Sequence, residues 1–136
     1  MKIAITIPQM LVRLVGSIML VLGALFWTGN MLSLIPVHML LGLILVLSLW
    51  AVAVLAARAG VHLGLVALAI GWGLVVPALG FTQDAILPGP AHWLIQVLHL
   101  LVGVAAIALA EALARRGKAH LEFGRRARQT LARSSP

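Results

Sequence analysis

Four long apolar stretches constrain the fold of this chain more than any other feature of its sequence. They cover residues 14–28, 34–57, 61–81 and 91–114, and the first extends back to Met10 if the Arg13 side chain reaches the membrane surface. A transmembrane helix needs about 20 apolar residues, with a range of about 17–25. Backbone polar groups in lipid must bond within the spanning structure, so helices are expected. The sequence therefore predicts an all-α, polytopic membrane four-helix bundle over residues 1–114.

The remaining segment, residues 115–136, is a basic tail. It holds seven of the ten Lys and Arg residues: Arg115, Arg116, Lys118, Arg125, Arg126, Arg128 and Arg133. With four crossings, Lys2, Arg13 and Arg58 fall on the same side as this tail, and the opposite loops contain no Lys or Arg. Because cytoplasmic loops are rich in Lys and Arg, we expect an inner (cell) membrane protein with both termini in the cytoplasm. The tail is expected to bind anionic lipids and not nucleic acid.

Composition excludes several classes of protein and site. Hydrophobic residues make up 62% of the chain and charged residues 10%, against about 45–50% and 25% in soluble domains. The absence of cysteine excludes disulfides, iron–sulfur clusters and covalently attached c-type haem. No small-x-small cleavage site follows the first stretch, so it is predicted to stay as a helix rather than to be removed as a signal peptide.

Acidic residues are nearly absent from the four stretches. Glu111 lies near the end of the fourth, and an ion pair with Arg115, one turn later, is its expected role. A proton-coupled transporter normally needs a carboxylate within the membrane, so this pairing disfavours that class. The sequence shows no Ser/His/Asp set, no paired carboxylates and no phosphate-binding glycine loop, and no enzyme class is predicted.

The two halves of the sequence resemble each other. "VGSIMLVLG" (15–23) corresponds to "LGLVALAIG" (63–71), and "HMLLG" (38–42) corresponds to "HLLVG" (99–103). The shared positions are Gly16 with Gly64, Gly23 with Gly71, His38 with His99 and Gly42 with Gly103. A duplication would relate the halves by a pseudo-two-fold axis along the membrane normal. His38 and His99 would then face each other at similar depth, on neighbouring parallel helices.

Two interpretations of this histidine pair remain open. Buried neutral imidazoles can hydrogen-bond neighbouring helices, worth about 0.6–2 kcal/mol. Alternatively, His38 and His99 could be the two axial ligands of haem b, since imidazole suits iron. The glycines likewise have two interpretations: they could let a porphyrin lie against the helix backbone, or they could allow close helix packing. The glycines near the proposed haem are Gly23, Gly42, Gly71 and Gly103. Trp50 and Trp72, in mid-span, are predicted to fill the core.

The stretches "HMLLGLILVLSLWAVAVLAAR" (38–58) and "HLLVGVAAIALAEALARR" (99–116) resemble helices of small b-type membrane cytochromes of the cytochrome b561 kind. In those helices a ligand histidine is followed by glycine one turn later, and a basic residue closes the helix. The resemblance implies a four-helix bundle, non-covalent haem b and electron transfer with quinol or a partner protein. This chain is shorter and lacks a second histidine pair, which puts a two-haem arrangement in doubt.

His92 is an alternative partner for His38, because His92, Gln96 and His99 share one helix face. We prefer His99, which the repeat aligns with His38 and which is better shielded from water. His92 and Gln96 are then candidates to contact the ligands or the haem propionates. The leading hypothesis is a haem b protein that moves single electrons near the outer face, with quinone or a redox protein as partner. The alternative functions are a cofactor-free structural or assembly subunit and a small transporter or channel. A second copy of the chain, in a homodimer, is a further candidate partner.

Overall fold

Four helices make up almost all of the computed structural model, which describes residues 1–134. Helix α1 covers Lys2–Trp27, α2 Ile35–Arg58, α3 Leu63–Thr82 and α4 Trp93–Ser134. Short 3-10 turns, Leu32–Leu34 and Gln83–Ala85, lie in the connections before α2 and after α3. Residues 135–136, the last two of the predicted tail, lie outside the described part of the chain.

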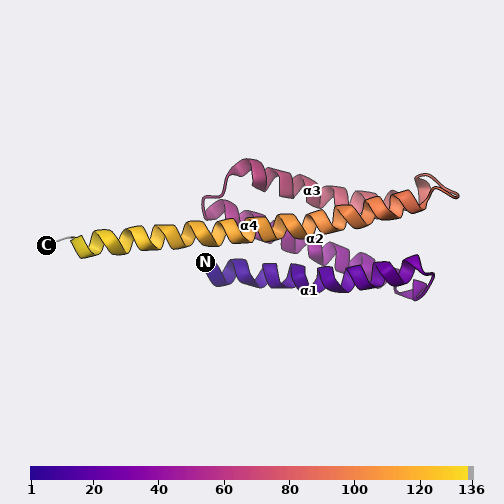
Figure 1. Ribbon diagram of the computed structural model, residues 1–136, viewed down its shortest axis with the longest axis horizontal. Helices are drawn as coiled ribbons and strands as arrows, with labels where there is room; N and C mark the ends of the chain where they lie inside the picture. Colours follow the sequence, from indigo (N-terminus) through magenta and orange to yellow (C-terminus); the bar gives the residue numbers. More distant parts are fainter. Residues whose placement is uncertain (135–136) are drawn as a thin grey trace.

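The helices run alternately up and down, so α2 and α4 are parallel to each other (Figure 1). Helices α2 and α4 contact each other and also pack against both α1 and α3. The connections 28–34 and 83–92 lie together at one end of the bundle, here called the loop end, and α1 begins at the other, the N-terminal end. Toward the loop end the α1–α2 and α3–α4 hairpins diverge (Figure 1).

All four helices are long and apolar enough to span a membrane. Large apolar side chains remain exposed around the bundle, among them Leu14, Leu43, Leu68, Phe81 and Leu101. Water-soluble monomers rarely expose apolar surface on this scale. The predicted all-α fold is therefore observed, and the four candidate spans indicate an integral membrane protein in contact with lipid.

Side-chain packing is tightest toward the N-terminal end. The largest fully buried side chains are Ile5, Val12, Leu49, Val52 and Leu113. They come from the first half of α1, the second half of α2 and the middle of α4, which lie side by side there. By contrast, no residue of α2 before Leu45 is buried. The loop end is consequently the loosely packed end of the bundle.

Two tryptophans join neighbouring helices in mid-bundle. The Trp50 indole N–H of α2 donates to the Ile70 carbonyl of α3 at 3.2 Å, and that of Trp72 on α3 donates to the Val102 carbonyl of α4 at 3.0 Å. The Trp50 ring lies directly over Gly73, where an added Cβ would come within 2.3 Å of Nε1. The predicted core role of both tryptophans is confirmed, and Gly73 is explained by helix packing.

Local sequence also accounts for the turn between α2 and α3. Gly60 adopts φ +89°, its N–H bonds the Ala57 carbonyl, and the N–H of Val61 bonds the Ala56 carbonyl. This Schellman arrangement, in the sequence "ARAG" (57–60), ends α2. His62 then caps α3, with its Nδ1 accepting a hydrogen bond from the Gly64 N–H at 3.1 Å.

The predicted boundaries of α1 and α4 are wrong at the N-terminal end of the bundle. Helix α1 begins at Lys2, well before Met10, because Ile5 and Val12 pack into the core and Arg13 finds a partner on α4. Helix α4 continues without a break through most of the predicted tail and projects beyond the bundle (Figure 1). Residues 115–134 are thus part of a 42-residue helix.

Gly73 and Gly71 give a matched test of this packing. We expect Gly73→Ala to lower the free energy of unfolding by about 1–3 kcal/mol, since the new methyl displaces the Trp50 ring. Gly71→Ala, where an added Cβ meets nothing within 4 Å, should leave stability unchanged or slightly raised. Denaturant titration in mixed micelles measures both variants, and equal stability of the two would contradict the assignment.

Candidate functional site

His38 and His99 lie together between the two hairpins, near the loop end. Their ring centroids are 6.3 Å apart, and the ring planes are tilted by 45°. Nδ1 of each ring is buried and has no hydrogen-bond partner among the described residues. The juxtaposition expected from the aligned halves is therefore observed. Neither Nδ1 makes the hydrogen bond to a neighbouring helix that one of the two interpretations invokes. Unsatisfied buried polar atoms are uncommon in proteins and often mark a site with a further occupant.

Residues of α1 and α3 complete the surroundings of the two rings. The Phe26 ring contacts His38 edge-on, with centroids 5.4 Å apart and an interplanar angle of 68°. Gly80 of α3 lies against His99, since a Cβ at position 80 would be 3.4 Å from Cε1 of that ring. All four helices thus contribute to the site, and both contacts are apolar.

Three of the predicted glycines lie about one helical turn from a residue of the histidine site. Gly42 and Gly103 follow His38 and His99 by one turn, and Gly23 lies one turn before the end of α1. A Cβ at Gly23 or Gly103 would meet nothing within 4 Å, and one at Gly42 would meet only the flexible end of Met19 at 3.4 Å. No fixed side chain fills the space over these glycines.

The other three predicted residues are Gly71, His92 and Gln96. Gly71 is nine residues before Gly80 on α3, about 13 Å along the helix, and is exposed. His92 precedes α4, and its Nδ1 lies 3.3 Å from the Ile86 carbonyl of the loop. Gln96 is half-buried on the first turn of α4. The structure thus places His99, not His92, beside His38.

Comparison of this chain with protein families, curated proteins and solved structures gives no significant match. No family is therefore identified, and the resemblance to b-type cytochromes stays a prediction. What the structure supports is its coarser part, four long apolar helices forming a membrane bundle.

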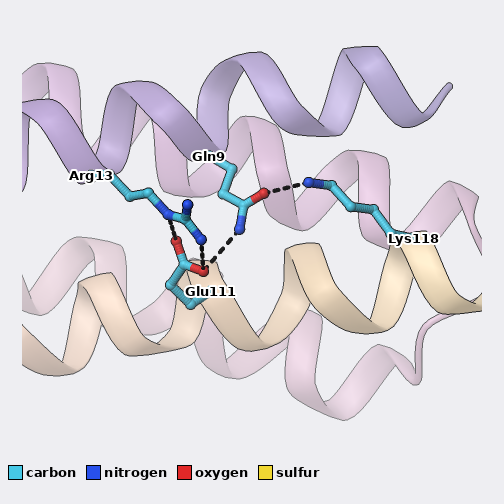
Figure 2. A network of polar contacts seen from close by, with 4 residues as sticks. All are labelled: Gln9, Arg13, Glu111 and Lys118. Carbon is cyan, nitrogen blue, oxygen red and sulfur yellow. Dashed lines mark hydrogen bonds and ion pairs between the residues drawn. The ribbon is translucent and has the colours of Figure 1, made fainter.

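A second polar cluster joins α1 to α4 near the N-terminal end (Figure 2). Arg13 donates to both carboxylate oxygens of Glu111, from Nε at 2.6 Å and from Nη2 at 2.8 Å. The Gln9 amide donates to Glu111 at 2.8 Å and accepts a hydrogen bond from Lys118 Nζ at 2.6 Å. Gln9 is only 3% exposed and lies within the helix interface, whereas the Arg13 side chain is 50% exposed. Farther along, Lys2 pairs with Glu122.

The predicted ion pair between Glu111 and Arg115 is wrong, because Glu111 pairs with Arg13 instead. Both oxygens of Glu111 turn toward α1, because Arg13 offers a bidentate partner there and Gln9 a third hydrogen bond. Arg115 contributes only a longer-range attraction. The carboxylate holds two helices together, and its hydrogen bonds suit a structural role better than proton transport.

Sequence reasoning missed this cluster, although its spacing was a usable signal. Gln9 and Arg13 are four residues apart, so they share a face of α1. Glu111 and Lys118 are seven apart and share a face of α4. Polar residues at such spacings within two antiparallel apolar helices predict a contact between them. Phe26 and Gly80 gave no comparable signal, because they lie among apolar residues on all sides.

Glu111→Ala tests the cluster. We expect a clear fall in the midpoint of thermal unfolding in detergent, since the change leaves the buried Gln9 amide and the Arg13 guanidinium without their shared acceptor. Glu122→Ala, which removes an exposed pair on the same two helices, should change the midpoint little. A larger effect from Glu122→Ala would contradict the assigned roles.

Proposed function

We propose that this integral membrane protein binds one haem b between α2 and α4, with His38 and His99 as axial ligands, and that it transfers single electrons near the loop end. The observation that carries the proposal is the pair of half-buried imidazoles, one from each of two neighbouring parallel helices, with ring centroids 6.3 Å apart. The unpartnered Nδ1 atoms add support, since both rings keep polar atoms that the surrounding helices leave unbonded.

The separation of the rings suits two ligands of one metal ion. A metal–imidazole bond is about 2.0 Å long, and the nitrogen lies about 1.1 Å from the ring centre, so opposed ligands have centroids about 6 Å apart. The observed 6.3 Å agrees with this value. The separation of the two rings is therefore compatible with ligation of one ion.

The kind of donor favours a porphyrin over a bare metal ion. Among the described residues, no group of three or more His, Cys, Asp or Glu side chains is placed to hold a metal. Bare transition-metal sites generally use three or four protein ligands. A haem brings four nitrogens of its own and needs only two axial side chains, which this site offers.

The chain's own residues would define the environment of the group. Phe26 and Gly80 pack against the histidine rings and orient them, and the open faces of Gly23 and Gly103 leave room beside them. Every Lys and Arg lies toward the N-terminal end, so polar residues of the loop end would meet the propionates, and His92 and Gln96, the nearest to His99 in sequence, are the candidates. When bound, haem b supplies a one-electron iron couple whose potential the pocket tunes. The electron partner is a quinol or a redox protein.

Haem spectroscopy of the purified protein tests the proposal. We expect b-type bands in the reduced-minus-oxidised spectrum of the wild type expressed with ample haem, and their loss in His38→Ala and in His99→Ala. His120→Ala, at the far end of the bundle, and His92→Ala should retain the bands. To separate ligation from folding, His38→Gly should recover them when imidazole is added.

Two outcomes would count against this assignment. Retention of haem in both ligand variants, with loss in His92→Ala, would make the ligand pair wrong. A colourless wild-type protein that takes up no haem in vitro would favour a cofactor-free structural or assembly subunit. That alternative has support of its own, because Gly16 and Gly117 are occupied by close packing against Ile107 and Ile5.

The proposal also places both termini in the cytoplasm of a cell whose inner membrane holds the protein. Because the chain has no cysteine, single cysteines can report this directly. In intact cells, a membrane-impermeant maleimide should label Ser33→Cys at the loop end, but label Gln129→Cys only after permeabilisation. The opposite pattern would invert the topology and place the histidine site near the inner face.

A further inference from the structure

One face of helix α4 carries a heptad seam of small and apolar residues. The spacing between successive seam residues alternates between four and three. These residues are Gly103, Ile107, Ala110, Ala114, Gly117, Leu121, Gly124, Arg128 and Leu131. Inside the bundle this seam faces α1 and α2. Ile107 lies against Gly16, Ala110 and Ala114 are fully buried, and Gly117 contacts Ile5 and Ala56. Such a repeat is the pattern of helices that pack side by side over several turns.

The same seam continues past the start of α1. Leu121 still packs against the core, and Lys2 of α1 pairs with Glu122, so the cover that α1 provides ends there. Gly124 lies one heptad beyond Gly117 on the same face, yet an added Cβ would meet nothing within 4 Å among the described residues. Arg125 and Arg128 beside it are exposed. The surface around Gly124, Arg125 and Arg128 is thus available for a further helix.

A shallow groove of about 450 Å³ follows this part of the seam. Leu121, Gly124 and Ala132 supply its small or apolar lining, and Arg125 and Arg128 its basic lining. Arg125 occupies the heptad position of Lys118, which inside the bundle bonds Gln9 of α1. Charged residues flanking a seam select the partner helix by complementary charge.

The position of the groove argues against a lipid surface as its occupant. The helix projects straight from the bundle (Figure 1), so Arg125 and Arg128 lie about 16 and 21 Å beyond Ala114, the last residue of the predicted span. Electrostatic attraction to a membrane falls off over about 8 Å at physiological salt. Arg115 and Arg116 remain near enough to meet anionic lipid headgroups.

A second copy of the chain fits the groove poorly. The segment from Arg115 to Ser134 has seven basic residues and a single acidic one, Glu122. Two such helices side by side would bring like charges together, including Arg128 against the seam of its copy. Opposite charge on the occupant removes this repulsion.

We propose that residues 121–128 of α4 form a docking surface for an acidic helix of a soluble partner protein. The partner helix would lie along the seam in line with α1, place an apolar side chain over Gly124 and oppose Arg125 and Arg128 with carboxylates. This surface is independent of the histidine site, so it stands whether or not the protein binds haem.

Charge reversal on and off the seam tests the proposal with the full-length protein in nanodiscs. The probe is a fluorescein-labelled acidic helical peptide with Leu at its seam positions and Glu at the flanking positions, followed by fluorescence anisotropy. Arg125→Glu/Arg128→Glu should weaken binding by about tenfold or more. Arg126→Glu/Arg133→Glu makes the same change in net charge on the opposite face and should weaken binding by no more than about threefold.

A steric pair of variants removes the charge from the comparison. Gly124→Trp fills the groove and should abolish binding, whereas Thr130→Trp, away from the seam, should not. Helicity of all variants is checked by circular dichroism. Equal weakening in the two charge variants, failure of the peptide to bind the wild type, or tighter seam-independent binding of single-stranded RNA or phosphatidylserine vesicles would each overturn the proposal.

Discussion

Close approach of backbones at small residues is the interaction on which this bundle depends. Lipid tails are as apolar as the helices, so burial of apolar surface does little to bring the helices together in a membrane. What remains is van der Waals packing and a few polar contacts. Ile107 over Gly16, Trp50 over Gly73 and Ile5 against Gly117 provide the first. The contact of Arg13 with Glu111 provides the second.

These contacts lie in the middle of the bundle and toward its N-terminal end. The looser packing of the loop end follows from their absence there. No residue of α2 before Leu45 is buried, and the two hairpins diverge there. The paired histidines occupy this looser region, where the glycines one turn away face open space instead of a neighbouring side chain. A tightly packed end that fixes the helices and a looser end that holds the polar pair are consistent with a division between stability and binding within one small bundle.

The sequence predicts the part of this structure that depends on hydropathy and on repeated spacing. The four helices follow from the apolar stretches, and the meeting of His38 and His99 follows from the alignment of two parallel helices. It does not predict the start of α1. A charged residue such as Arg13 normally marks the end of a membrane-spanning stretch, and its partner Glu111 on α4 is apparent only in the structure. The helical extension of α4 is equally hidden, since its polar composition carries no hydropathy signal. Phe26 and Gly80 could not be placed because α1 and α3 are apolar on most sides, and no pattern tells which face turns inward.

The histidine pair has a consequence for how the protein assembles. His38 belongs to the first hairpin and His99 to the second, and only the short turn around Gly60 joins the two hairpins. Neither half of the chain can form the site alone. A chain divided at that turn into two co-expressed fragments would regain its paired rings only when the fragments recombine, which would make the site a reporter of association between two hairpins within a bilayer.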